Sequence, residues 1–155
     1  MEYCNDWPFS EVMPEAKRPN ILVVGNSGSG KSSLIHTVLG DGENMKNDVI
    51  GESMEQDFYC FENAAIRLWD SRGLRLGESE SVFRRRMTEF IDDCRIDPDV
   101  REHIHLLWYL IPGSGARVTE CDLKLMQSIL SRDQVIAVIS KSDITRPAQA
   151  AAIRR

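Results

Sequence analysis

The chain has 155 residues, of which 42% are hydrophobic and 28% are charged. This is the composition of one soluble globular domain, and it excludes collagen-like and wholly disordered chains. The net charge of −5 opposes sequence-independent attraction to a phosphate polymer, so broad nucleic-acid coating is disfavoured. No sequence-specific nucleic-acid partner is predicted either. Apolar runs such as Leu106–Ile111 are far shorter than the roughly 20 residues that span a bilayer, so we predict no transmembrane segment.

The first residues differ in character from the rest. Residues 1–19 contain three prolines and no sustained hydrophobic period, and we interpret them as an N-terminal leader segment ahead of a domain formed by residues 20–155. The segment lacks the basic start and apolar centre of a signal peptide, so a cytoplasmic localisation is expected. Four widely spaced cysteines are typical of reduced thiols rather than of a disulfide framework.

The first half of the domain begins with a strand and a helix. Residues 21–24 are all apolar and end at Gly25, which predicts a buried strand, and apolar positions from Lys31 to Leu39 predict a helix that Gly40 ends. Residues 41–57 are polar without a period, which indicates either a functional loop or mobility. Residues 58–61 and 64–69 then predict two short strands joined by a tight turn, the second of which ends at Asp70.

The second half continues the alternation. An amphipathic helix is predicted from Val82 to about Arg95, a buried strand over 105–111, a helix over 119–130 and a buried strand over 135–139. Strands that alternate with helices, several of the strands apolar throughout, predict an α/β fold, in which helices cover both faces of a mostly parallel sheet in three layers.

A phosphate-binding loop follows the first strand. The segment Gly25–Ser32 fits GxxxxGK[ST] and lies between an apolar strand and an amphipathic helix, as the motif requires. Its glycines allow backbone amides to surround an anion at the positive end of the helix dipole. Lys31 is expected to bridge the β- and γ-phosphates, and the Ser32 hydroxyl to bind Mg²⁺. The predicted nucleotide-binding residues of this segment are Asn26, Ser27, Gly28, Ser29, Gly30, Lys31, Ser32 and Ser33.

Two further motifs concern the metal and the base. The segment Asp70–Gly73 fits DxxG, in which Asp70 would hold Mg²⁺ through water and Gly73 would donate an N–H to the γ-phosphate. The segment Ser140–Asp143 fits [NT]KxD with serine in first place. Asp143 would accept two hydrogen bonds from guanine, which adenine does not offer together, and the Lys141 stem would lie along the ring. We predict Lys31 and Gly73 as the catalytic residues.

With these three motifs in order, residues 20–155 resemble the Ras-like small GTPase domains of the translation-factor-related class, nearest to the Era and septin-like branch of 50S ribosome-binding GTPase-like domains. The resemblance implies GTP and GDP binding with Mg²⁺, GTP hydrolysis, and two loops, here 41–57 and 71–80, that order around the γ-phosphate. It also implies a switch residue in the Mg²⁺ shell. No threonine lies between Thr37 and Thr88, so Ser53 is our candidate.

Two of the departures from this family bear on turnover and on the extent of the fold. Leu74 stands where Ras-type members place a water-orienting glutamine, so intrinsic turnover on the order of 10⁻⁴ per second or lower is expected unless a protein partner or self-association supplies the group. The chain also ends soon after Asp143, where the family continues through a helix, a strand and a closing helix. The G domain is therefore expected to be truncated, with one open sheet edge.

Several alternatives remain open. One alternative is a nucleotide-binding scaffold that does not hydrolyse GTP, and another is a P-loop ATPase. Arg84, Arg85 and Arg86 would supply an arginine finger in one interpretation and a solvated helical face in the other. The downstream partner is not indicated by any residue.

Overall fold

The computed structural model describes residues 18–40, 46–48, 58–73, 77–113, 118, 120–129, 134–141 and 143. Within these residues the chain forms six strands and three helices. In chain order they are β1 (Asn20–Gly25), α1 (Lys31–Leu39), β2 (Lys46–Asp48), β3 (Phe58–Glu62), β4 (Arg67–Ser71), α2 (Glu80–Ile96), β5 (Leu106–Pro112), α3 (Glu120–Ile129) and β6 (Val135–Ser140).

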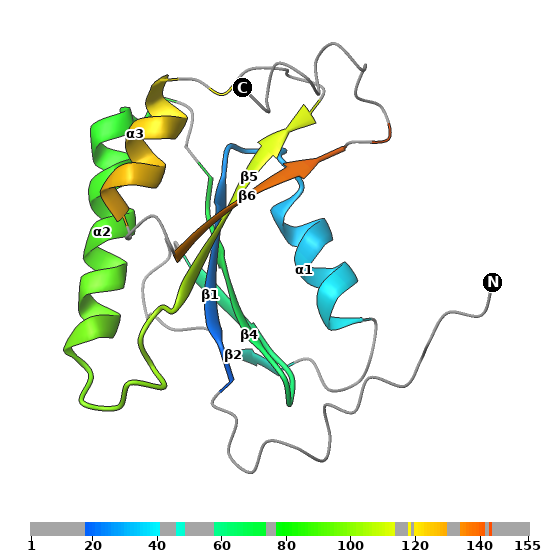
Figure 1. The fold of residues 1–155 in the computed structure, drawn as a ribbon, viewed down its shortest axis with the longest axis vertical. Helices are drawn as coiled ribbons and strands as arrows, with labels where there is room; N and C mark the ends of the chain where they lie inside the picture. Colours follow the sequence, from blue (N-terminus) through cyan, green and yellow to red (C-terminus); the bar gives the residue numbers. More distant parts are fainter. Residues whose placement is uncertain are drawn as a thin grey trace.

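All six strands join one sheet with the order β2-β3-β4-β1-β5-β6. The pairs β1–β4, β1–β5 and β5–β6 are parallel, whereas β2–β3 and β3–β4 are antiparallel. Figure 1 shows α1 on one face of the sheet, and α2 and α3 together on the other. The predicted three-layer α/β fold is therefore confirmed. In the described part of the chain, no helix is long and apolar enough to cross a membrane.

The central strand β1 supplies both cores because its side chains alternate between the two faces. Leu22 and Val24 pack with Met87 of α2, in a cluster that also includes buried residues of β5 and α3. Ile21 and Val23 pack with Ile35 of α1. Burial on both faces explains why this strand reads as a continuous apolar run rather than an alternating one.

The loop predicted over residues 41–57 contains a strand. Lys46–Asp48 forms β2, which pairs antiparallel with β3 and makes the sheet six-stranded rather than five-stranded. Its three residues are all polar, so they carry no hydrophobic alternation by which the sequence would reveal them. The strand is defined by main-chain pairing alone.

The boundaries of the β3–β4 hairpin also differ from the prediction. The Asn63 side chain accepts hydrogen bonds from the backbone N–H groups of Ala65 (2.9 Å) and Ile66 (3.0 Å), which forms a turn where a strand was expected. The second strand therefore begins at Arg67, not at Ala64. It also extends past Asp70 to Ser71, whose hydroxyl donates to the Val23 carbonyl at 2.7 Å.

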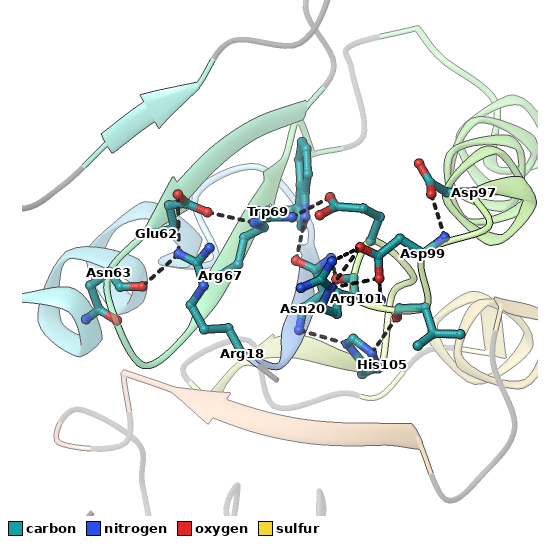
Figure 2. A network of polar contacts seen from close by, with 12 residues as sticks. Arg18, Asn20, Glu62, Asn63, Arg67, Trp69, Asp97, Asp99, Arg101 and His105 are labelled. Carbon is teal, nitrogen blue, oxygen red and sulfur yellow. Dashed lines mark hydrogen bonds and ion pairs between the residues drawn. The ribbon is translucent and has the colours of Figure 1, made fainter. Parts of the chain in front are cut away.

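The amino ends of β1, β4 and β5 are joined by a polar network (Figure 2). The Arg67 guanidinium contacts the carboxylates of Glu62 (2.7 Å) and Glu102 (2.5 Å). Nearby, Nδ1 of His105 accepts from the backbone N–H of Asn20 at 2.9 Å. Arg18 also reaches Glu62, at 3.3 Å, so the start of the described chain is held against the hairpin. This network lies at the end of the sheet opposite the phosphate-binding loop, which follows the carboxyl end of β1.

Candidate functional site

The loop between β1 and α1 has the backbone conformation that its glycines allow. Gly28 and Gly30 have φ values of 75° and 97°, in the left-handed region that favours glycine. The backbone N–H of Ser29 donates to the Asn26 carbonyl at 3.1 Å, which closes a turn. Gly30 is the N-cap of α1 and has no side chain to accept from the first helical amides. These amides and the helix dipole therefore favour an anion at this end of α1.

Lys31 lies within this loop rather than in solvent. Its side chain is only 8% exposed, and Nζ donates to the carbonyls of Gly25 (3.0 Å) and Asn26 (3.1 Å). Burial lowers the pKa of Lys31, and the nearby Asp70 charge partly opposes this shift. The ammonium group is thus held over the loop, where a bound phosphate would stabilise its buried positive charge.

Ser32 and Asp70 are brought together from α1 and β4. The Ser32 hydroxyl donates to Oδ2 of Asp70 at 2.7 Å, while Oδ1 is buried and has no hydrogen-bond partner among the described residues. Burial raises the pKa of Asp70, opposed by the hydrogen bond from Ser32 and by the charge of Lys31. A hydroxyl and a carboxylate with an unpartnered oxygen fit Mg²⁺, which takes few protein ligands and keeps waters and phosphate oxygens. Ser53, the other predicted ligand, lies outside the described residues.

Gly73 places the DxxG segment directly against the phosphate-binding loop. A Cβ on Gly73 would lie 2.7 Å from the backbone N of Ser27 and 3.0 Å from the Gly25 carbonyl oxygen. Any larger residue would force the two segments apart. This close approach is a physical reason for glycine at the fourth position of the motif, in addition to the N–H predicted from sequence.

The third motif also contacts the loop. The Ser140 hydroxyl donates to the Ser29 carbonyl at 2.6 Å, and Nζ of Lys141 donates to the Gly28 carbonyl at 2.9 Å. Lys141 has a positive φ of 54°, which is uncommon for a residue with a side chain. The contact made by Ser140 was missed by sequence reasoning, because the hydroxyl and its acceptor are far apart in the chain. Asp143 is exposed at the same end of the sheet.

The remaining candidate residues lie on α1 and α2. Ser33 is exposed on the first turn of α1, and its carbonyl accepts from the Thr37 hydroxyl at 2.8 Å. The interpretation of Arg84, Arg85 and Arg86 as a uniformly solvated face is wrong for Arg86. The Arg86 side chain is only 13% exposed and pairs with Glu78 at 3.0 Å, because its position on α2 lies over the buried ring of Phe83.

The family assignment follows from the sequence that carries this site. The model of the 50S ribosome-binding GTPase family matches residues 20–141, from the start of β1 through Lys141. The chain belongs to this family. Curated relatives include Septin CDC11 of Candida albicans, which is 25% identical over an alignment of 158 residues that covers 83% of this chain and 38% of the septin. The predicted resemblance to a P-loop G domain with septin-like relatives is thus confirmed.

A second curated protein and two solved structures are also similar to this chain. Cell division control protein 11 of Encephalitozoon cuniculi is 26% identical, over 85% of this chain and 55% of its own length. The chain therefore spans only about a third to a half of the curated relatives that it matches. Among solved structures, a probable GTP-binding protein, EngB, superposes with a TM-score of 0.56 at 19% identity, over 87% of this chain and 76% of that one. The G domain of the T. maritima FeoB iron transporter gives a TM-score of 0.49 at 18% identity, over 81% and 74% of the two chains.

Proposed function

We propose that this chain is a guanine-nucleotide-binding switch domain that binds GTP and GDP with Mg²⁺ and hydrolyses GTP slowly. The observation that carries the proposal is the convergence of three distant segments on one loop. Lys31 covers its carbonyls, Gly73 packs against Ser27, and Ser140 and Lys141 donate to its far side. The backbone amides from Asn26 to Ser33 and the Lys31 ammonium would hold the phosphates.

The proposed roles of the remaining residues follow from their chemistry. Ser32, with Asp70 acting through water, would hold Mg²⁺, which supplies charge neutralisation at the phosphate oxygens. We also propose Ser53 as a further Mg²⁺ ligand. Asp143 would accept from the guanine edge, and Gly73 would donate its N–H to the γ-phosphate. The domain would work in the cytoplasm.

Binding of fluorescent GDP, GTP and ATP, each with and without Mg²⁺, tests this proposal. We expect guanine nucleotides to bind more tightly than ATP, and Mg²⁺ to strengthen GTP binding. Asp143→Asn should weaken guanine binding about a hundredfold, because hydrogen bonds to a charged acceptor contribute about 1.5 to 3 kcal/mol each. Asp93→Asn, an equivalent change at an exposed position on α2, is the matched control and should leave binding unchanged. Equal affinity for ATP in the unsubstituted protein would favour the ATPase alternative.

Hydrolysis is a separate part of the proposal. Leu74 has no group that orients water, so we expect a single-turnover rate on the order of 10⁻⁴ per second or lower, compared with the intrinsic rate of Ras. Phosphate release from GTP with protein in excess measures it. A rate of several per second in the isolated protein would contradict the assignment. No release at all would instead support the second candidate, a nucleotide-binding scaffold, which Leu74 also favours.

A protein partner or a second copy of the chain would then supply the missing group. Repeating the assay at increasing protein concentration distinguishes the two sources, because only self-association makes the hydrolysis rate per molecule rise with protein concentration.

A further inference from the structure

Arg86 is a nearly buried cation outside the phosphate-binding loop. It lies on α2, and its guanidinium carbon is 5.3 Å from the centre of the Phe83 ring, which belongs to the core between α2 and the sheet. A guanidinium over an aromatic face is favourable, and more so where water is excluded. The Arg86 side chain is therefore held by the protein rather than extended into solvent.

The same guanidinium contacts two segments on either side of residues 74–76, which lie outside the described part of the chain. Its Nη2 atom donates to Oε2 of Glu78 at 3.0 Å and to the backbone carbonyl of Arg72 at 3.4 Å. The Glu78 side chain is only 9% exposed. An ion pair with this little solvent is screened weakly, so removal of one partner should weaken the hold of Arg86 on this part of the chain.

Each contact continues into a functional element. The Arg72 carbonyl belongs to the peptide bond that leads to Gly73, and Gly73 packs against Ser27 of the phosphate-binding loop. On the other side, Glu78 directly precedes Ser79, whose hydroxyl accepts from Val82 N–H at 3.4 Å as the N-cap of α2. Arg86 thus connects the DxxG segment to the first turn of α2.

We propose that Arg86 and Glu78 form a latch that fixes the Arg72–Gly73 peptide against the phosphate-binding loop, and that the pair are positioning residues for the γ-phosphate end of the nucleotide. The proposal rests on the proposed GTP-binding function. The loop amides and Lys31 would hold the phosphates that GDP and GTP share, whereas Gly73 serves only the third phosphate. Loss of the latch should therefore weaken triphosphate binding selectively. In this proposal Arg86 has a positioning role and is not an arginine finger.

The first test requires no nucleotide. Trypsin cleaves after arginine, and the peptide bond after Arg72 is the one whose carbonyl the latch holds, while the Arg72 side chain is exposed. In Glu78→Gln, we expect cleavage between Arg72 and Gly73 to be about tenfold faster, because the charged hydrogen bond is lost. Cleavage after Arg95, at the end of α2, is the internal reference and should not change. The control Glu89→Gln removes the exposed partner of Arg85 and should leave both rates unchanged.

The second test measures nucleotide selectivity in the same proteins. In Glu78→Gln, affinity for a non-hydrolysable GTP analogue with Mg²⁺ should fall about tenfold, while affinity for GDP stays within about twofold. In the double variant Glu78→Gln/Arg86→Gln, the loss should be no greater than in Arg86→Gln alone, because Glu78→Gln removes only an interaction that Arg86→Gln also removes. If Glu78→Gln does not fold by circular dichroism, Arg86→Lys replaces it, and this variant should show the same selectivity in weaker form.

The outcomes separate the latch from the function on which it rests. Unchanged cleavage after Arg72 would overturn the latch, and so would an equal loss of GDP and GTP-analogue binding. If the unsubstituted protein bound neither nucleotide, the proposed function and the positioning role would both fail, and the cleavage rates would still decide whether the contact exists.

Discussion

Ser29 and Ser71 are a matched pair of buried serines at the functional end of the sheet. Each is 1% exposed. The Ser71 hydroxyl donates to the Val23 carbonyl at 2.7 Å, whereas the Ser29 hydroxyl has no hydrogen-bond partner among the described residues. A buried hydroxyl without a partner loses its hydration and gains nothing in return. Only the backbone of Ser29 takes part in the proposed phosphate site.

Substitution of these two residues should therefore have opposite effects. We expect Ser29→Ala to raise the free energy of unfolding by about 1 kcal/mol, and Ser71→Ala to lower it by about 1 kcal/mol, since the Val23 carbonyl then loses its donor. Urea denaturation of the nucleotide-free protein measures both. If Ser29→Ala destabilised the domain as much as Ser71→Ala does, the hydroxyl would have a partner and the interpretation would be wrong.

The hairpin formed by β3 and β4 is the element whose stability should depend most clearly on pH. Glu62 and Arg67 are paired residues of the two strands, and Arg67 donates to the Glu62 carboxylate at 2.7 Å. This hydrogen bond, with the charges of Arg67 and Arg18, lowers the pKa of Glu62 below its ordinary 4.5, although burial opposes the shift. A carboxyl with a depressed pKa stabilises the folded state above its unfolded pKa.

This contribution should be lost as the pH falls below 4.5 and through the lower pKa of the folded state. Glu62→Gln should lower the free energy of unfolding by about 1 to 2 kcal/mol near neutral pH, and the difference from the unsubstituted protein should shrink in acid. Denaturation midpoints across this pH range provide the measurement. Glu89→Gln removes an exposed pair and should change stability by less than about 0.5 kcal/mol. A pH-independent loss in Glu62→Gln would show that packing, not charge, is responsible.

At the scale of the whole molecule, the parts of the fold that depend on contiguous motifs and on hydrophobic periodicity were predictable from the sequence. The loop from Gly25 to Ser32 was predictable because its glycines and the flanking strand and helix are contiguous, and the structure has β1, loop and α1 in that order. The apolar stripe of α2 likewise placed Phe83, Met87 and Ile91 in the core, but Val82, which begins the same stripe, is 44% exposed. Val38 of α1, however, is 40% exposed although it lies on the predicted apolar face. Only part of that helix face packs against the sheet.

Contacts between distant segments were not predictable from the same patterns. The strand β2 exists only through its pairing with β3. The bond from Lys141 to the Gly28 carbonyl and the latch between Arg86 and Glu78 each depend on how helices and strands are arranged in space. From the sequence, Lys141 was predicted to contact the base and Arg86 to lie on a solvated helical face. Local sequence patterns do not indicate which polar groups from distant segments come into contact.

The two hydrogen bonds from the end of β6 to the phosphate-binding loop have a kinetic consequence. Within the described residues β6 is the last strand in the sheet order, and strands at a sheet margin open more easily than central ones. Ser140 and Lys141 donate hydrogen bonds to carbonyls of the phosphate-binding loop. Fraying of β6 would therefore loosen this loop before the central strands of the sheet unfold. Escape of a bound nucleotide would then be a local unfolding event, and its residence time would depend partly on a strand that does not contact it.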